Sequence, residues 1–148
     1  MEDGQYAVSI KGVVFNEPDR VILLLNERQE WELPGGRIER GESPAECVVR
    51  EFKEELDIAI SPAVLLDTYL FEVIPRKHVF IVTYGCQLAG VFCPKISEEH
   101  LQACTFDVNV LPVNLPEGYR NSILTWHSRR TRASRSQLRC EGGRRSAR

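Results

Sequence analysis

The segment from Ser43 to Leu56 constrains the fold most strongly, because it encodes an amphipathic helix with a well-marked start. Ser43 is a good N-cap, Pro44 suits the first helical position, and Glu46 completes a capping box. At about 100° of rotation per residue, one face of this helix is apolar. That face consists of Ala45, Val48, Val49, Phe52 and Leu56. Such a stripe suits packing against a β-sheet.

A second face of the same helix carries three carboxylates, Glu51, Glu54 and Glu55. Like charges at this spacing repel and destabilise a helix by about 0.2 to 0.5 kcal/mol per pair. Mg²⁺ prefers hard oxygen ligands, and a helical carboxylate cluster can supply several at fixed spacing. The pattern therefore indicates an Mg²⁺ (or Mn²⁺) site. The alternative is a solvated acidic face on which Arg50 and Lys53 pair locally.

The remaining hydrophobic pattern predicts strands on either side of this helix. Two pairs of apolar segments, 6–15 with 20–25 and 64–74 with 78–88, are separated by turn residues and predict β-hairpins. Short strands are expected at 31–33 and 104–110, whereas Pro34-Gly35-Gly36 is expected to break regular structure. A second helix is expected to open at 114–117. This order predicts an α+β fold, an α/β/α sandwich with a mixed β-sheet between helices.

The charge distribution divides the chain at residue 128. With 148 residues and 43% apolar content, the chain can form one hydrophobic core, which we assign to 1–128. From Arg129 onward there are eight arginines and one acid, so the rest holds 11 basic and 20 acidic residues, a formal charge of −9. An acidic body binds a polyanion poorly unless cations intervene. The segment 129–148 is expected to be a flexible, Arg-rich tail. Such a tail could contact RNA or another polyanion, or it could fold over the acidic body.

Other features predict where such a protein resides. No apolar run approaches the roughly 20 residues that span a bilayer, so no membrane association is expected. Glu2 and Asp3 stand where a secretory signal would carry basic residues. Five scattered cysteines show no metal-binding spacing and are interpreted as reduced thiols. These features predict a cytoplasmic protein.

The residues around the carboxylate helix resemble the box of the MutT/Nudix hydrolases, G-x5-E-x7-R-E-U-x-E-E-x-G-U, where U is a bulky apolar residue. Gly36 and Glu42 precede the run Arg50-Glu51-Phe52-Lys53-Glu54-Glu55-Leu56-Asp57-Ile58 at this spacing. One defined position differs, since Asp57 stands where the family has glycine. Aspartate tolerates the positive φ expected there. The resemblance implies the Nudix fold over about residues 5–128.

The resemblance also implies roles for individual residues. Glu51 and Glu55 would be primary metal ligands, with Glu54 a further ligand or the general base and the carbonyl of Gly36 completing the set. Arg50 would orient Glu54, or form only an ordinary helix ion pair with it. Glu42 would close the preceding loop onto the helix or carry a metal through water. Glu98 and Glu99 are alternative bases from a later loop. Arg37 would contact a substrate phosphate, and Asn114 would lie near the nucleobase. His78, His100 and His127 have no ligand spacing and are expected at the surface or at caps.

The implied activity is metal-dependent hydrolysis of a diphosphate linkage in a nucleoside diphosphate derivative, with (d)NTP pyrophosphohydrolase preferred. Hydrolysis of ADP-ribose or of dinucleoside polyphosphates is the alternative, as is a non-catalytic nucleotide- or RNA-binding module. The strand before Leu111-Pro112 carries Thr105-Phe106 where small relatives have Trp-Phe. It also has Val110 where they have an acidic residue, which weakens any substrate assignment by analogy.

Overall fold

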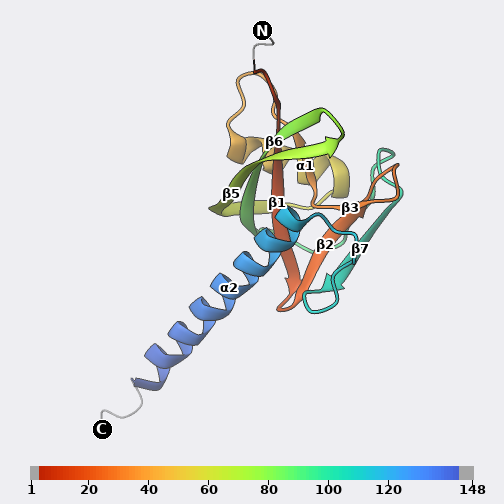
Figure 1. Ribbon diagram of the computed structural model, residues 1–148. Coiled ribbons are helices and arrows are strands. Elements are labelled where there is room, and N and C mark those ends of the chain that lie inside the picture. The colour runs from red at the N-terminus through yellow and green to blue at the C-terminus, as the bar shows by residue number, and fades with distance from the viewer. Residues whose placement is uncertain (1–3, 144–148) are drawn as a thin grey trace.

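The computed structural model describes residues 4–143 and contains one mixed sheet with two helices (Figure 1). The elements are β1 Ala7–Glu17, β2 Arg20–Leu25, β3 Trp31–Glu32, β4 Gly35–Arg37, α1 Pro44–Leu56, β5 Ile60–Ile74, β6 Lys77–Leu88, β7 Gln102–Asp107 and α2 Glu117–Gly143. Strands β3-β2-β1-β6-β5 form the main order, with β4 also paired to β1 and β7 to β2.

Both predicted hairpins are confirmed. β1 and β2 pair antiparallel through the turn at Pro18-Asp19, and β5 pairs antiparallel with β6 along its length. β5 begins at Ile60, earlier than expected. The two hairpins join through a parallel pairing of β1 with β6, which runs from Ala7 opposite Val79 to Val14 opposite Cys86. This one parallel contact makes the sheet mixed, as predicted.

Helix α1 begins and ends as its sequence predicts. The Ser43 hydroxyl accepts a hydrogen bond from the Glu46 amide at 3.2 Å, and the Glu46 carboxylate accepts one from the Ser43 amide at 2.8 Å. At the other end, Asp57 adopts the left-handed conformation with φ 54° and ψ 39°. Its side chain also pairs with Lys53 one turn earlier. The replacement of the family's glycine by Asp57 therefore preserves the helix end.

The core lies on both faces of the sheet. Even-numbered residues of β1, such as Ile10 and Val14, pack in a cluster with Phe52 and its neighbours on α1. Odd-numbered residues, such as Val13, pack in a second cluster with α2, which contributes Tyr119, Ile123 and Trp126. Because side chains alternate between the faces of a strand, each helix covers its own face. The predicted sandwich is confirmed.

The predicted break at Pro34-Gly35-Gly36 is present at Pro34, which separates β3 from β4, but the prediction was wrong for the two glycines. Gly35 to Arg37 form strand β4, which pairs antiparallel with β1. Gly35 has φ 139°, and a Cβ on it would lie 2.0 Å from the carbonyl oxygen of Ile10. Only glycine allows the two backbones to approach so closely. The two glycines that were interpreted as a break therefore permit a strand.

Two further boundaries differ from the prediction. β7 ends at Asp107, because the chain turns there and the Val110 amide donates to the Asp107 carbonyl. α2 begins at Glu117 and continues to Gly143, so 129–143 is helical where an irregular tail was expected. No proline interrupts 117–143, and its Arg, Ala, Gln and Leu residues favour helix. Residues 144–148 of the expected tail lie outside the described residues, and the domain boundary at 128 stays a prediction.

Within residues 4–143, no helix has the length and apolar character needed to cross a membrane. Figure 1 shows that α2 packs against the sheet with its first turns and then projects away from it. The exposed side chains of residues 131–139 agree with this arrangement. We call residues 131–143 the α2 arm.

Candidate active site

A cavity of about 550 Å³ lies between β4, the carboxylate face of α1 and the loops that follow β2 and precede β7. Five residues singled out from the sequence line it: Gly36, Arg37, Glu51, Glu55 and Glu99. Glu32 from β3 and His100, next to Glu99, complete its wall. Glu32 and His100, which are 68 positions apart in the sequence, therefore meet at one place.

The two glycines of β4 allow α1 to approach closely. A Cβ on Gly36 would lie 2.5 Å from Oε1 of Glu51, so any other residue would displace this carboxylate from its present position. The Gly35 amide donates a hydrogen bond to Oε1 of Glu55 at 2.8 Å. Glu51 and Glu55 are thus held against the backbone of β4, one beside each glycine.

A buried network surrounds Glu55. Nε2 of His100 lies 3.3 Å from Oε2 of Glu55 and 3.0 Å from Oε1 of Glu32. Beneath them, Lys11 of β1 is buried, and its Nζ donates to the Gly35 carbonyl at 3.4 Å. Asn26 donates to the second oxygen of Glu32 at 3.4 Å. The two carboxylates therefore share one histidine and lie near one buried cation.

Burial acts differently on these carboxylates. It raises the pKa of Glu55 to about 7, although Lys11 and the Gly35 amide oppose the shift. It would also raise the pKa of Glu32, but Lys11 and hydrogen bonds from His100 and Asn26 prevail and lower that pKa to about 2. Glu32 accepts hydrogen bonds from two side chains, whereas Glu55 also lies near the like-charged Glu51, so desolvation prevails at Glu55 and not at Glu32.

Arg50 ties the helix to the preceding loop. Its Nε donates to Glu42 at 2.6 Å, and its Nη2 donates to the other oxygen of Glu42 at 3.1 Å. Nη1 donates to Glu51 at 3.1 Å and to Glu54 at 3.0 Å. A bidentate Arg–carboxylate pair is geometrically specific, and this one lowers the pKa of Glu42 to about 2. The contacts assumed for Arg50 and Glu42 are present, while their roles stay predictions.

Four predicted site residues do not line the cavity: Arg50, described above, and Glu54, Glu98 and Asn114. The Glu54 side chain is 58% exposed and pairs with Nη1 of Arg50 at 3.0 Å. Glu98 and Asn114 are exposed and are not among the residues around the cavity. Glu99 is therefore the cavity-facing member of the two loop candidates.

The donor set fits a divalent cation. In residues 4–143, no three Asp, Glu, His or Cys side chains converge as a finished metal site, and Glu54 is turned toward Arg50. Glu51 and Glu55, however, offer hard oxygen donors on one cavity wall, and burial raises the pKa of both. The space that a Cβ on Gly36 would fill lies directly against Glu51. Negative oxygen donors that burial disfavours are stabilised by a nearby cation.

Sequence reasoning missed Glu32, Lys11 and His100. The expectation that His100 lies at the surface or at a cap was wrong, since its side chain is 8% exposed and contacts two carboxylates. Lys11 could have been noticed as a charge inside the apolar run 6–15. No local pattern marks His100, because its partners lie 45 and 68 residues away in the sequence.

Comparison with known proteins agrees with this geometry. Residues 5–126 match the family model of the NUDIX domain. An ADP-ribose pyrophosphatase of Methanocaldococcus jannaschii is 34% identical over 112 residues, 72% of this chain and 64% of its own length. An 8-oxo-dGTP diphosphatase of Proteus vulgaris is 39% identical over 57 residues, 36% of this chain and 50% of its own length. The alignments thus cover about half to two thirds of these relatives.

Among solved structures, the MutT NUDIX hydrolase from Burkholderia pseudomallei superposes with a TM-score of 0.71 at 26% identity. The superposition covers 80% of this chain and 96% of that one. The match thus extends over nearly all of the solved protein and most of this chain.

Proposed function

Since this chain belongs to the Nudix family, we propose that it catalyses the metal-dependent hydrolysis of a diphosphate linkage in a nucleoside diphosphate derivative. The observation that carries the proposal is the packing of Glu51 and Glu55 against Gly36 and Gly35 at the wall of an open cavity. A non-catalytic binding module has less need of one buried and one half-buried carboxylate that repel each other.

The cavity residues supply the metal ligands, a contact for a substrate phosphate and a candidate general base. Glu51, Glu55 and the Gly36 carbonyl would hold Mg²⁺ or Mn²⁺. Glu54 lies outside the cavity and would have to leave Arg50 to become a further ligand. When bound, the ion screens the diphosphate charge and lowers the pKa of a water molecule. Arg37 lies at the cavity and can contact a substrate phosphate.

A general base is still required to accept the proton of the attacking water. Glu99 is favoured over Glu98 because it lines the cavity. It is also favoured over Glu54, whose carboxylate is engaged by Arg50 on the outer side of α1. Asn114 remains a proposed nucleobase contact, although no contact with the cavity supports it.

The (d)NTPs and ADP-ribose are the two substrate groups to be tested first. The relative named as an 8-oxo-dGTP diphosphatase supports the (d)NTP preference, whereas the relative named for ADP-ribose aligns with a larger share of this chain. Hydrolysis of a (d)NTP between its α- and β-phosphates releases pyrophosphate. Cleavage of ADP-ribose at its diphosphate releases AMP and ribose 5-phosphate, so product analysis distinguishes the two.

The proposal predicts turnover that depends on an added divalent metal. A panel of (d)NTPs, 8-oxo-dGTP, ADP-ribose and dinucleoside polyphosphates should be incubated with Mg²⁺, with Mn²⁺ and with EDTA. We expect at least one substrate to yield a nucleoside monophosphate with either metal and none with EDTA. Tight nucleotide binding without turnover on the whole panel would instead favour the binding module.

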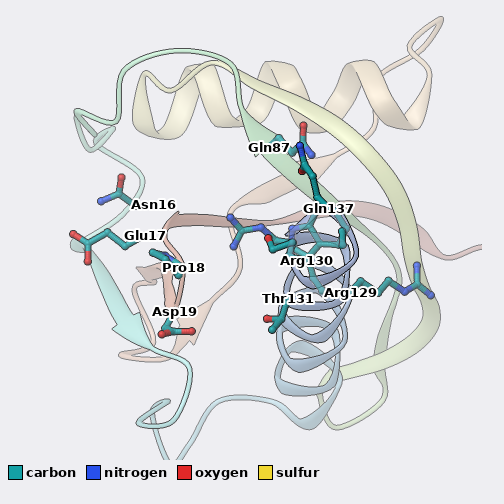
Figure 2. A pocket seen from close by; sticks show the side chains of 12 residues that line it. Asn16, Glu17, Pro18, Asp19, Gln87, Arg129, Arg130, Thr131 and Gln137 are labelled. Atoms are coloured by element: carbon teal, nitrogen blue, oxygen red, sulfur yellow. The ribbon is translucent and has the colours of Figure 1, made fainter. Parts of the chain in front are cut away.

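We propose in addition that the α2 arm binds the phosphate backbone of RNA. At about 100° per residue, Arg132, Arg135 and Arg139 lie within about 60° of one another on the helix, and all three are exposed. Arg130 is different, because its guanidinium lies over the Phe15 ring at 4.9 Å. It lines a second cavity, of about 740 Å³, between the β1–β2 turn and the middle of α2 (Figure 2). Over residues 131–139, whose side chains the structure describes, the arm thus presents a basic stripe and no apolar face, which suits a polyanion.

Exchanging Arg132, Arg135 and Arg139 for glutamine should weaken binding of a short RNA and flatten its salt dependence, because fewer counterions are released. Hydrolysis of small nucleotides should be unchanged. Arg76→Gln with Lys77→Gln, at the exposed β5–β6 turn, is the matched control. RNA affinity equal to wild type across a salt series would contradict the proposal. A gain in small-substrate turnover at low salt would instead indicate that the arm docks on the acidic body.

A further inference from the structure

The segment between β6 and β7 is attached to the end of α1 that carries Glu55. The Lys95 amide donates to the Leu56 carbonyl at 2.7 Å, and the Ser97 amide donates to the Glu55 carbonyl at 2.9 Å. The last carbonyls of a helix have no partner within the helix, and here the loop supplies their donors. At its other end, the Leu101 amide donates to the Leu25 carbonyl of β2 at 3.0 Å. Residues 95–101 therefore connect α1 to the sheet; we call them the anchored loop.

His100 is the side chain of this loop that enters the network around the cavity. Its Nε2 approaches Glu32 on β3 and Glu55 on α1, at 3.0 and 3.3 Å. Because the Gly35 amide already binds the other oxygen of Glu55, both oxygens of this carboxylate are fixed from outside α1. Glu99, which precedes His100 in the anchored loop, lines the cavity. The anchored loop thus fixes the Glu55 carboxylate through His100 and places the Glu99 carboxylate at the cavity.

A purely space-filling histidine does not explain this arrangement. Nδ1 of His100 is buried and has no hydrogen-bond partner among the described residues. Leaving a buried polar atom unpaired is costly, and such atoms are rare in folded proteins. An apolar residue of similar size would avoid the cost, but it could not donate to the two carboxylates.

We propose that His100 is a positioning residue that sets the orientation of Glu55 and holds Glu99 at the cavity. The inference rests on the proposed function for its consequences in catalysis. The anchoring of the loop by His100 depends only on the contacts of His100 with Glu32 and Glu55. Residues that orient a metal ligand typically change metal affinity or activity about 10- to 100-fold when they are removed.

The test compares His100→Ala with His100→Gln, whose amide can donate a hydrogen bond from a similar reach. Mn²⁺ binding is measured without substrate, from the electron paramagnetic resonance signal of the free ion. We expect His100→Ala to weaken Mn²⁺ binding at least about 10-fold and His100→Gln to recover most of the loss. His78→Ala is the control, because His78 pairs with Glu72 and does not line the cavity. Unchanged Mn²⁺ affinity in His100→Ala, or no recovery in His100→Gln, would overturn the proposal.

Amide hydrogen exchange of the full chain tests the anchoring independently of any metal. The Lys95 and Ser97 amides should exchange faster in His100→Ala than in the wild type, and near the wild-type rate in His100→Gln. Equal rates in all three proteins would overturn the anchoring. If His100→Ala does not fold, His100→Asn replaces it in both measurements. The asparagine side chain is shorter, so its amide donor does not reach the two carboxylates. A wild type that binds no Mn²⁺ and cleaves no nucleotide would refute the proposed function, and the exchange rates would still decide the anchoring.

Discussion

Glu51→Gln is expected to lower kcat by several orders of magnitude while the protein stays folded. Glutamine keeps the shape of glutamate but replaces an anionic oxygen donor by a neutral one, which binds Mg²⁺ weakly. The fold should tolerate the change because burial already raises the pKa of Glu51. Arg50 would also retain its contacts with Glu42 and Glu54. Glu55→Gln should lose turnover to a similar degree.

Turnover at saturating Mg²⁺ and the melting temperature measure the two parts of this expectation. Glu72→Gln is a suitable control, since Glu72 lies on β5 and does not line the cavity. If both Glu51→Gln and Glu55→Gln retain near-wild-type kcat, these residues are not the metal ligands. A large loss of melting temperature would show instead that the carboxylates serve the fold.

Gly35→Ala should destabilise the protein by roughly 3 to 5 kcal/mol, from overpacking and backbone strain together. The new Cβ would lie 2.0 Å from the Ile10 carbonyl oxygen and 2.8 Å from the Lys11 Cα. Both are backbone atoms of β1 and cannot move without disturbing the centre of the sheet. The positive φ of 139° adds to the cost. For a chain of this size the melting temperature should fall by about 10 °C.

Gly41→Ala separates the steric clash from the backbone strain. Gly41 has φ 79°, but no atom lies within 4 Å of its added Cβ. Its substitution should therefore cost only about 1 kcal/mol, the penalty of a left-handed conformation. Thermal or urea unfolding of both variants measures the difference. Equal losses of stability would contradict the view that close contact with β1 makes Gly35 necessary.

The sequence by itself determined the features that depend on neighbouring residues. The capping box at Ser43 and the tolerance of Asp57 for positive φ defined both ends of α1, and hydrophobic runs separated by turn residues defined both hairpins. The helical repeat placed Glu51 and Glu55 on one face. These features are local, because each involves residues within a few positions of one another.

Tertiary structure decided the features that depend on contacts between distant residues. The expected break at Gly35 became strand β4 because β1 lies against it, and Glu99 rather than Glu98 reached the cavity. His100 meets Glu32 across 68 residues of sequence, through the pairing of β7 with β2 and of β2 with β3. No periodicity within one segment encodes such a contact, since the register between strands sets it. The sequence therefore located the carboxylates, and packing supplied the residues that hold them.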